Sequence, residues 1–441
     1  MTDRTKPFFR VQTVDAVRTR AARVAPCPAE RVELAGALGR SLAGELHAPA
    51  DLPGFPRAVM DGYAVRSRDT FGTGESSPGY LCLVGEVPMG EVPAFTIVPG
   101  ECARIGTGGM LPGGADAVVM VEHTRALADG TVEIIRPVAP GGHVLGPTDD
   151  AAAGQRLLPA GQRLRPQDLG LLAALGVTEV AVVTRPRVGI LSTGDEVVPI
   201  DVAPRPGQVR DVNTHTLTAQ VAEAGGIPVP MGLVADDPTR LRDAVQAARA
   251  RSDLLLLSGG SSMGTRDLTV EIFRSFAGAE LLVHGVAVAP GKPFIWVHTG
   301  AGGPACHLLG LPGQVASCMI AFHLFVEPIL ERMLGRAARS FTRFARRRAT
   351  LARNLPSVPG REEYVRVRLE RTGGDGAREA PDGDGPDGDA PDDSPDAWRA
   401  EPLFGKSGLI RTLTAGHGLV RVPAHAEGLD EGTPVTVLLY P

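Results

Sequence analysis

One sequence pattern occurs three times between Arg187 and Gly335: an apolar run ends in a glycine-containing turn and is followed by residues with helical spacing. Apolar runs that alternate with helices predict a parallel sheet covered on both faces, and such sheets bind ligands beyond the carboxyl ends of their strands. Glycine lets backbone N–H groups approach a ligand, so these turns suit phosphate or another oxyanion. The runs are residues 187–192, 253–257 and 307–311, and the turns are Thr193-Gly194-Asp195-Glu196, Ser258-Gly259-Gly260-Ser261 and Pro312-Gly313-Gln314.

The chain of 441 residues is too long for one core, and roughly two to four domains are expected. Residues 11–44 have apolar side chains at helical spacing, which predicts helix across this segment. The segments that follow it have the pattern of short strands and indicate a β-rich unit, and short strands at the C-terminus indicate a small barrel or sandwich. We predict an elongated α/β multidomain protein with a helical and β-rich N-terminal region, a doubly wound parallel-sheet domain and a C-terminal small β-barrel. The predicted domains are 1–185 with an inserted β-rich domain at about 47–149, then 186–336, then 337–441.

Residues 373–397 hold nine acidic residues and one arginine among many glycines and prolines. Such a composition cannot bury enough apolar surface to offset its ordering entropy, so it predicts a disordered acidic loop. A calcium loop at Asp382-Gly383-Asp384-Gly385 is disfavoured because prolines interrupt it and the bidentate glutamate is missing. The whole chain has a formal charge of −5, so its remainder is close to neutral or mildly basic, which fits an anionic small molecule.

Composition argues against several kinds of partner. Aromatic residues make up 4% of the chain, which is too few for a base-stacking surface, so no nucleic acid is expected as a partner. The arginines of residues 332–348 could suggest nucleic-acid binding, but they are interpreted as the solvated end of a helix. No apolar run reaches the ~20 residues that a membrane span needs, and residues 1–10 lack a signal core. The five cysteines are scattered without a C-x-x-C pair, so neither a disulfide framework nor a zinc site is predicted. A cytoplasmic location is therefore expected.

Short motifs recur in one order along the chain, and their order and spacing resemble the molybdopterin molybdenumtransferase family, the molybdenum insertases that include the E domain of gephyrin. The resemblance covers nearly the whole chain. It implies a helical dimerisation region with an inserted β domain, an α/β molybdopterin-binding domain and a β-barrel. The motifs are residues 60–66 (Met-Asp-Gly-Tyr-Ala-Val-Arg), Thr107-Gly108-Gly109, 114–119, 192–196, Asp211-x-Asn213, Asp236-Asp237-Pro238, Ser258-Gly259-Gly260, Pro290-Gly291-Lys292-Pro293 and Leu311-Pro312-Gly313.

The resemblance also implies an activity in molybdenum cofactor biosynthesis. A member of this family transfers molybdenum from molybdate to adenylated molybdopterin, cleaves the pyrophosphate link and releases AMP. Magnesium is the expected metal, and the expected assembly is a homodimer.

Candidate site residues lie at the predicted strand ends. Carboxylates there can hold a divalent cation or position water, so Glu196, Asp236 and Asp267 are the expected catalytic and magnesium-binding residues. By resemblance, Asp61, Thr107 and Asp150 are catalytic too, and face the α/β site across a dimer interface. The expected substrate-binding residues are Thr193, Gly194, Ser258, Gly259, Gly260, Lys292, Pro312 and Gly313.

Each assignment has a structural alternative. Asp195 and Asp236 are of a type that caps turns and helices, and Asp61 and Thr107 also fit a glycine turn without a ligand. An exposed lysine such as Lys292 is commonly only a solvated charge.

The chain departs from the family pattern where anions would bind. A stretch usually rich in arginine is Leu-Gly-Pro-Thr-Asp-Asp at residues 145–150, two lysine positions are Gly285 and Ala289, and Gln314 replaces an asparagine. Fewer cations attract an oxyanion less strongly. Two interpretations stay open: an active insertase that uses Lys292 with Arg210 or Arg266, and a non-catalytic relative that binds molybdopterin, a nucleotide or a protein. A molybdopterin adenylyltransferase is disfavoured by the additional domains.

Overall fold

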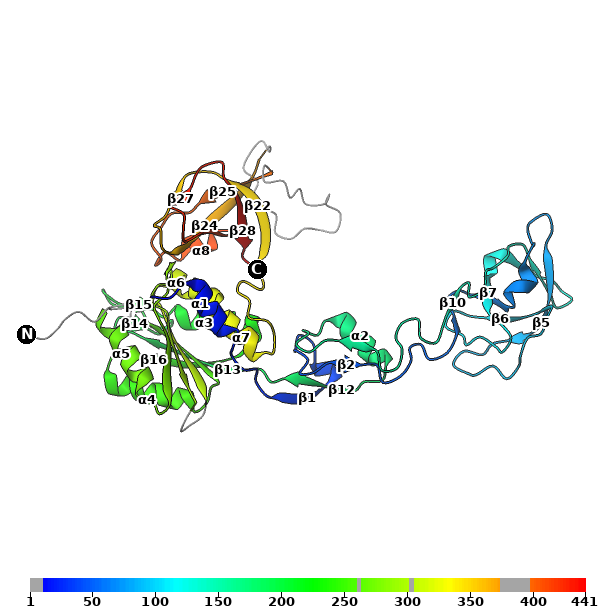
Figure 1. The fold of residues 1–441 in the computed structure, drawn as a ribbon, viewed down its shortest axis with the longest axis horizontal. Helices are drawn as coiled ribbons and strands as arrows, with labels where there is room; N and C mark the ends of the chain where they lie inside the picture. The colour runs from blue at the N-terminus through cyan, green and yellow to red at the C-terminus, as the bar shows by residue number, and fades with distance from the viewer. Residues whose placement is uncertain (1–10, 260–262, 301–304, 373–396) are drawn as a thin grey trace, which may run out of the picture. The chain divides into compact units, whose positions relative to one another are not determined.

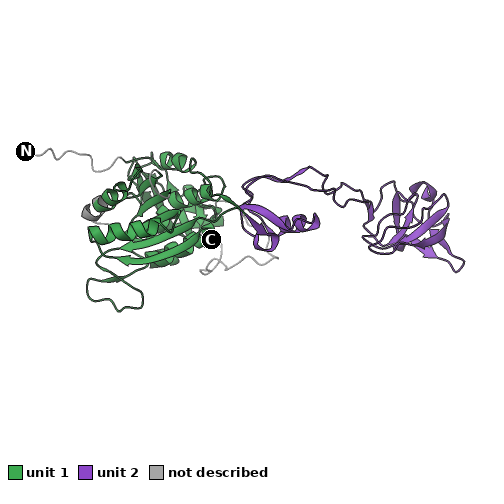
Figure 2. Ribbon diagram, turned by 90° about the horizontal axis from the view of Figure 1, so that it is seen from below, with its two compact units in different colours: residues 1–30, 183–441 green, residues 31–182 purple. Residues whose placement is uncertain are grey.

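The computed structural model describes residues 11–259, 263–300, 305–372 and 397–441, and for residues 263–267 it describes the backbone alone. It contains two compact units, residues 1–30 with 183–441, and residues 31–182 (Figure 2). The first unit holds the α/β sheet and the C-terminal strands, and the second holds the N-terminal β-rich region. The chain therefore leaves the first unit after its opening helix and returns to it at residue 183.

The α/β domain is built on a six-stranded sheet in the order β16-β13-β17-β21-β20-β18 (Figure 1). The first four strands are parallel, whereas β20 and β18 make antiparallel pairs. The connection from β20 to β21 spans residues 300–305 and is too short for the crossover that a parallel pair requires. The predicted α/β class is confirmed, but the sheet is not entirely parallel, because β20 and β18 form an antiparallel edge. The strands are β13 (Arg187–Thr193), β16 (Ile227–Val234), β17 (Leu254–Gly259), β18 (Ala279–His284), β20 (Ile295–Thr299) and β21 (Cys306–Leu311).

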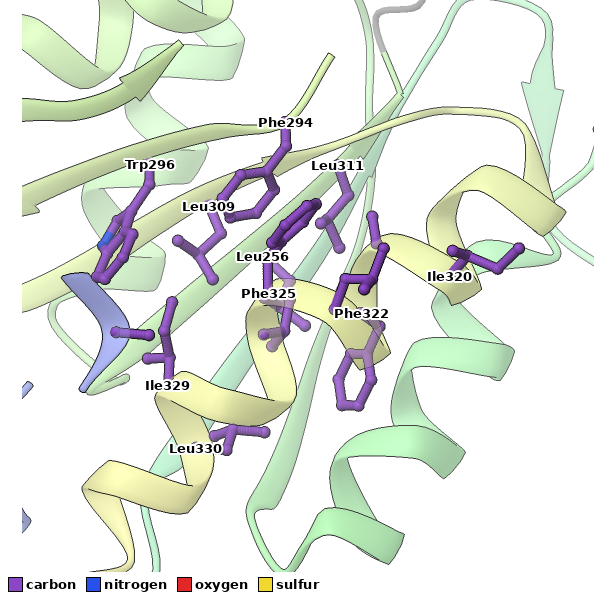
Figure 3. Close-up of a cluster of buried hydrophobic side chains, with 14 of the residues drawn as sticks. Leu256, Phe294, Trp296, Leu309, Leu311, Ile320, Phe322, Phe325, Ile329 and Leu330 are labelled. Carbon is purple, nitrogen blue, oxygen red and sulfur yellow. The ribbon is translucent and has the colours of Figure 1, made fainter. Parts of the chain in front are cut away.

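Helices cover both faces of this sheet. One face packs against α1, α3 and the continuous helix α6–α7, where Phe294, Trp296 and Phe325 are fully buried (Figure 3). The other face packs against α4 and α5 through Val245 and Phe273. With both faces covered, the ends of the strands remain for ligands. The helices are α1 (Val14–Ala21), α3 (Asn213–Ala224), α4 (Pro238–Arg249), α5 (Met263–Arg274), α6 (Val315–Ala321), a π-helical turn (Phe322–Val326) and α7 (Glu327–Met333).

The prediction of helix across residues 11–44 is wrong beyond α1. After Ala21 the chain forms β1 (Ala29–Glu33), which pairs with β12 (Glu179–Val183), and a short 3-10 turn (Leu34–Gly36). Pro26 and Pro28 lie between α1 and β1, and proline does not continue a helix. Val32, Leu34 and Leu42 pack instead in a small core with α2 (Pro166–Ala174), whereas Leu38 is exposed, so a long-range pairing prevails over the local spacing.

The β-rich part of the second unit agrees with the short strands expected there. Its main sheet has the order β7-β4-β6-β5-β9-β8, and two short antiparallel pairs, β2 with β11 and β3 with β10, accompany it. The strands are β2 (Leu46–His47), β3 (Arg57–Ala58), β4 (Gly62–Val65), β5 (Gly79–Glu86), β6 (Glu101–Ile105), β7 (Ala117–Met120), β8 (Thr124–Ala126), β9 (Thr131–Ile134), β10 (Val144–Leu145) and β11 (Arg156–Leu158).

The C-terminal strands close into the predicted small barrel, because each of five strands pairs with two neighbours in the ring β24-β25-β22-β28-β26. The short strand β19 of the α/β domain adds to β24 in parallel, which joins the barrel to the α/β domain. The predicted disordered loop falls almost entirely outside the described residues. The elements are β19 (Val288–Ala289), β22 (Ala345–Leu351), β23 (Leu355–Pro356), β24 (Glu362–Arg371), β25 (Trp398–Pro402), α8 (Arg411–Thr414), β26 (Gly418–Val422), β27 (Gly428–Leu429) and β28 (Pro434–Leu439).

In the part of the chain that is described, no helix combines the length and the apolar character that crossing a membrane requires.

Candidate active site

The three glycine-containing turns of the sequence lie at one edge of the α/β sheet. Strands β13, β17 and β21 are adjacent and parallel, with Ser192 beside Ser258, Thr193 beside Gly259, and Ser258 beside Leu311. Their carboxyl ends therefore stop at the same level, with Thr193, Gly259 and Leu311 as the last residues of the three strands. A side chain at Gly259 would collide with the carbonyl oxygen of Thr193, and its φ of 126° is one that only glycine adopts easily. The close approach of the two turns thus depends on glycine.

Thr193 and Asp236 are in direct contact at this edge. The Thr193 hydroxyl donates to Asp236 Oδ1 at 2.6 Å, and the backbone N–H of Asp236 donates to Asp195 Oδ1 at 3.1 Å. The capping role considered for Asp236 belongs to its neighbour, because Asp237 Oδ1 accepts the N–H of Arg240 at 2.8 Å and caps α4. Asp236 is half-buried, and its contact with Thr193 connects the segment after β16 to the end of β13.

Glu196 follows the Thr193-Gly194 turn and is exposed. Its carboxylate folds back over the turn, since a Cβ on Gly194 would lie 2.9 Å from Glu196 Oε2. Gly194 has a φ of 147°, so both its conformation and its surroundings exclude a side chain. The backbone of Glu196 is fixed by β14 (Val197–Val198) and β15 (Val209–Arg210), where its carbonyl accepts the N–H of Val209 at 2.8 Å. Glu196 therefore presents an exposed carboxylate from a rigid turn.

A buried polar cluster lies beneath these strand ends, and of its members only Ser258 was among the predicted site residues. The Ser192 hydroxyl lies 2.9 Å from the Thr214 hydroxyl and 3.0 Å from the Ser258 hydroxyl, and it donates to Asp211 Oδ1 at 3.2 Å. Asn213 extends the cluster to the third turn by donating to the Gly313 carbonyl at 2.8 Å. Two serines within otherwise apolar buried strands were the available signal, because buried hydroxyls need partners. The cluster ties all three turns together.

The remaining predicted residues of the α/β domain differ in their exposure. Pro312 is buried, Gly313 accepts from Asn213, and Lys292 is exposed on the turn after the short strand β19. Ser258 is 1% exposed, so it supports the turn and offers little surface to a ligand. Arg210, considered as a replacement cation, donates its Nε to the Ile200 carbonyl at 3.0 Å. Gly260 and the side chains of Asp267 and Arg266 lie outside the described residues.

The predicted site residues of the second unit form a turn of their own. Asp61 Oδ1 accepts both the backbone N–H of Thr107 at 2.6 Å and its hydroxyl at 2.8 Å. These hydrogen bonds, the backbone one first, lower the pKa of Asp61 from its ordinary value of 3.8. Asp150 is exposed, and its backbone N–H donates to the Leu52 carbonyl at 3.2 Å. The expectation that these residues face the α/β site of a partner subunit stays a prediction.

The described residues contain no group of three or more His, Cys, Asp or Glu side chains arranged to hold a metal ion. At the edge of the sheet the Asp195 carboxylate accepts the backbone N–H of Asp236, and Glu196 follows Asp195 on the same turn. Mg²⁺ is commonly held by one or two carboxylates together with substrate phosphates and water. The described residues therefore fit a magnesium ion that arrives with a phosphorylated substrate rather than one held in a protein cage.

Known proteins resemble this chain over most of its length. Molybdopterin molybdenumtransferase from Nostoc sp. is 40% identical over 308 residues, 70% of each chain, and the Bacillus subtilis protein of the same name is 30% identical over 93% of this chain and 89% of its own. Three family models match in order: the MoeA N-terminal region (domain I and II) at residues 11–176, a probable molybdopterin binding domain at 189–332, and the MoeA C-terminal region (domain IV) at 395–440. The chain belongs to the MoeA family.

The solved structures agree with this assignment. A molybdopterin biosynthesis MoeA protein from Pyrococcus horikosii superimposes with a TM-score of 0.77 at 34% identity, covering 98% of this chain and 99% of its own. The MoeA relationship confirms the resemblance inferred from the motifs. It also confirms the predicted multidomain α/β architecture with a C-terminal barrel.

Proposed function

We propose that this chain inserts molybdenum from molybdate into adenylated molybdopterin and releases AMP. As a MoeA protein it is a transferase of molybdenum cofactor biosynthesis. The observation that best supports the specific reaction is the alignment of the carboxyl ends of β13, β17 and β21, where glycine-containing segments begin. Turns of this kind present backbone N–H groups to phosphates, and adenylated molybdopterin carries a pyrophosphate.

The turns and the carboxylates at this edge would have different roles in the reaction. The turns at Thr193-Gly194 and Pro312-Gly313 would bind the phosphates, and Glu196 and Asp236 would hold Mg²⁺ or orient the attacking oxygen. Bound to the pyrophosphate, the magnesium ion would supply charge neutralisation. Thr193 fixes the carboxylate of Asp236 through its hydroxyl, so the orientation of this carboxylate is set before substrate binds.

We propose further that the active protein is a cytoplasmic homodimer, with Asp61, Thr107 and Asp150 contributing to catalysis. Isologous dimers are the commonest assemblies of soluble proteins. All five cysteines are free thiols, which suits a reducing compartment. Sedimentation equilibrium of the purified full chain tests the assembly: a mass near twice 46.0 kDa is expected, and a stable monomer with full activity would contradict the dimer.

The reaction is tested by incubating the full chain with adenylated molybdopterin and Mg²⁺, with molybdate or with sulfate at the same concentration. AMP release that requires molybdate is expected. Sulfate is the control because it has the same charge and shape but cannot be inserted. Tight binding of adenylated molybdopterin without AMP release would contradict the insertase and favour the non-catalytic relative, for which the missing cations at Gly285 and Ala289 are the motivating observation.

A further inference from the structure

The linker between the α/β domain and the barrel has a backbone conformation that its sequence does not favour. It runs from Leu334 to Phe344, between the end of α7 and the start of β22. Phe341 has a φ of 55°, and only His143 shares a positive φ with it among the non-glycine residues that the structure describes. A bulky residue rarely adopts this left-handed conformation unless surrounding contacts hold it there. The contacts around Phe341 therefore need an explanation.

The buried carboxylate of Glu327 holds this linker. Glu327 is the first residue of α7 and is 3% exposed. Its Oε1 accepts the backbone N–H of Thr342 at 2.7 Å and the Thr342 hydroxyl, and its Oε2 accepts the backbone N–H of Phe341 at 3.2 Å. His323 donates from Nδ1 to the same Oε2 at 2.9 Å. One carboxylate thus receives four hydrogen bonds, three of them from the strained residue and its neighbour.

Gln220 of α3 sets the orientation of His323, which lies in the π-helical turn. Gln220 Nε2 donates to the Met319 carbonyl at 3.3 Å and lies 2.9 Å from His323 Nε2. Because an amide nitrogen is a donor only, His323 Nε2 accepts this hydrogen bond, and the ring donates to Glu327 from Nδ1. Turning the ring would break both hydrogen bonds. The contact between His323 and Glu327 is therefore supported from α3.

Aromatic rings continue these contacts into the barrel. The His323 ring stacks on Phe341 with centroids 5.7 Å apart, and Phe341 stacks on Tyr364 of β24 with centroids 5.6 Å apart. Phe344 packs edge-on against His323 and Phe341, with centroid distances of 4.7 Å and 5.0 Å. The ring of Phe341 thus lies between the α/β domain and a barrel strand. These contacts form an attachment of the barrel that is separate from the pairing of β19 with β24.

We propose that Glu327 is a conformational latch for the barrel: its four hydrogen bonds fix the linker, and when they break the linker opens while both domains stay folded. This inference is independent of the proposed reaction, because it rests on contacts within the first unit alone. Burial raises the pKa of Glu327, but its contacts with His323 and Thr342 lower it more, so the pKa stays below its ordinary value of 4.5. The carboxylate is therefore ionised, and both of its oxygens can accept.

Hydrogen exchange of the full chain, measured by mass spectrometry, tests the latch. Glu327→Gln keeps the size of the side chain, but an amide has one oxygen, so two of the four donors lose their acceptor whichever way it is oriented. Exchange of the linker peptide, residues 337–344, should accelerate by about tenfold or more, because losing buried hydrogen bonds makes local opening easier. Exchange of β22, which begins the barrel, should change little because the barrel stays folded.

Glu331→Gln is the matched control. Glu331 lies on the same helix, is 7% exposed and pairs with Arg336 at 3.2 Å. This variant also removes a buried negative charge from α7, but the acceptor of Phe341 and Thr342 remains. Exchange of the linker peptide should therefore stay close to that of wild type, even if the melting temperature falls.

Two results would overturn the latch: unchanged exchange of the linker peptide in Glu327→Gln, or an equal acceleration in Glu331→Gln. If Glu327→Gln also exposes β22 to exchange, the barrel itself has unfolded, and Thr342→Val decides. This variant removes one hydroxyl donor from an exposed residue, so the fold should persist. Acceleration of the linker peptide by about threefold would support the latch, and no acceleration would overturn it.

Discussion

Two aspartates in the two units make similar hydrogen bonds in opposite surroundings. Asp211 in the α/β domain is 7% exposed and accepts the Ser192 hydroxyl and the N–H of Thr214. Asp61 in the β-rich unit is exposed and accepts the N–H and hydroxyl of Thr107. Breaking a buried hydrogen bond leaves an unsatisfied group, whereas water replaces a lost partner at the surface. The buried aspartate therefore supports the fold, and exposed carboxylates such as Asp61 and Glu196 retain acceptor capacity for a ligand.

The largest effect is expected where an exposed carboxylate serves the reaction. Glu196→Gln keeps the shape of the side chain but removes its charge, so AMP release should fall by about 100-fold or more while the melting temperature stays within a degree or so. Single-turnover AMP release and differential scanning calorimetry measure the two quantities. Turnover equal to that of wild type would remove Glu196 from the mechanism.

A smaller effect, on stability instead of turnover, is expected at the buried aspartate. Asp211→Ala removes the acceptor of the Thr214 N–H and one of the three partners of the Ser192 hydroxyl, which should cost about 2–3 kcal/mol of unfolding free energy and lower the melting temperature by several degrees. Asp61→Ala is the matched comparison and should change the melting temperature far less. Equal losses in the two variants would contradict the distinction between the buried and the exposed aspartate.

The smallest effect concerns the protonation of Asp61. Hydrogen bonds from Thr107 lower its pKa, so the stability they confer is present above the ordinary pKa of 3.8 and is lost as pH falls through the lower folded value. Thr107→Val removes the hydroxyl donor and keeps the backbone donor, so the pKa of Asp61 should rise part of the way back. Titration of ¹³C-labelled aspartate carboxyls by NMR measures it. A pKa that falls in Thr107→Val would contradict this account.

Much of the fold was predictable because its signals are local. The apolar runs of β13, β17 and β21 and the glycine turns after them are contiguous in sequence, and so are the helices between them. The segment 22–44 was predicted wrongly because β1 pairs with β12, whose residues come some 145 positions later in the chain. The spacing of apolar residues within the segment cannot indicate so distant a partner. The antiparallel edge escaped prediction for a similar reason, since strand direction depends on connection length more than on composition.

The candidate site was predictable to a lesser degree. The turn residues Thr193, Gly194 and Gly259 were named from sequence, and the structure brings them together. Ser192 and Asp211 belong to motifs quoted from the sequence, but neither they nor Thr214 were predicted as site residues, because a buried polar cluster is defined by contacts among three separate segments. The contact of the barrel loop with α6 was not predicted for the same reason, because only the hydrogen bonds of Ser407 with Ala316 and Gln314 reveal it.

The placement of α1 has a consequence for synthesis of the chain on the ribosome. Val14, Val17 and Ala21 are almost fully buried in the same core as α7, yet α7 is translated some 300 residues later. At roughly 5–20 residues per second, the apolar face of α1 waits about 15–60 s for its partners, while the β-rich unit between them can already fold. Helix α1 is thus synthesised long before the helix that covers it, and its apolar face lacks that cover during the interval.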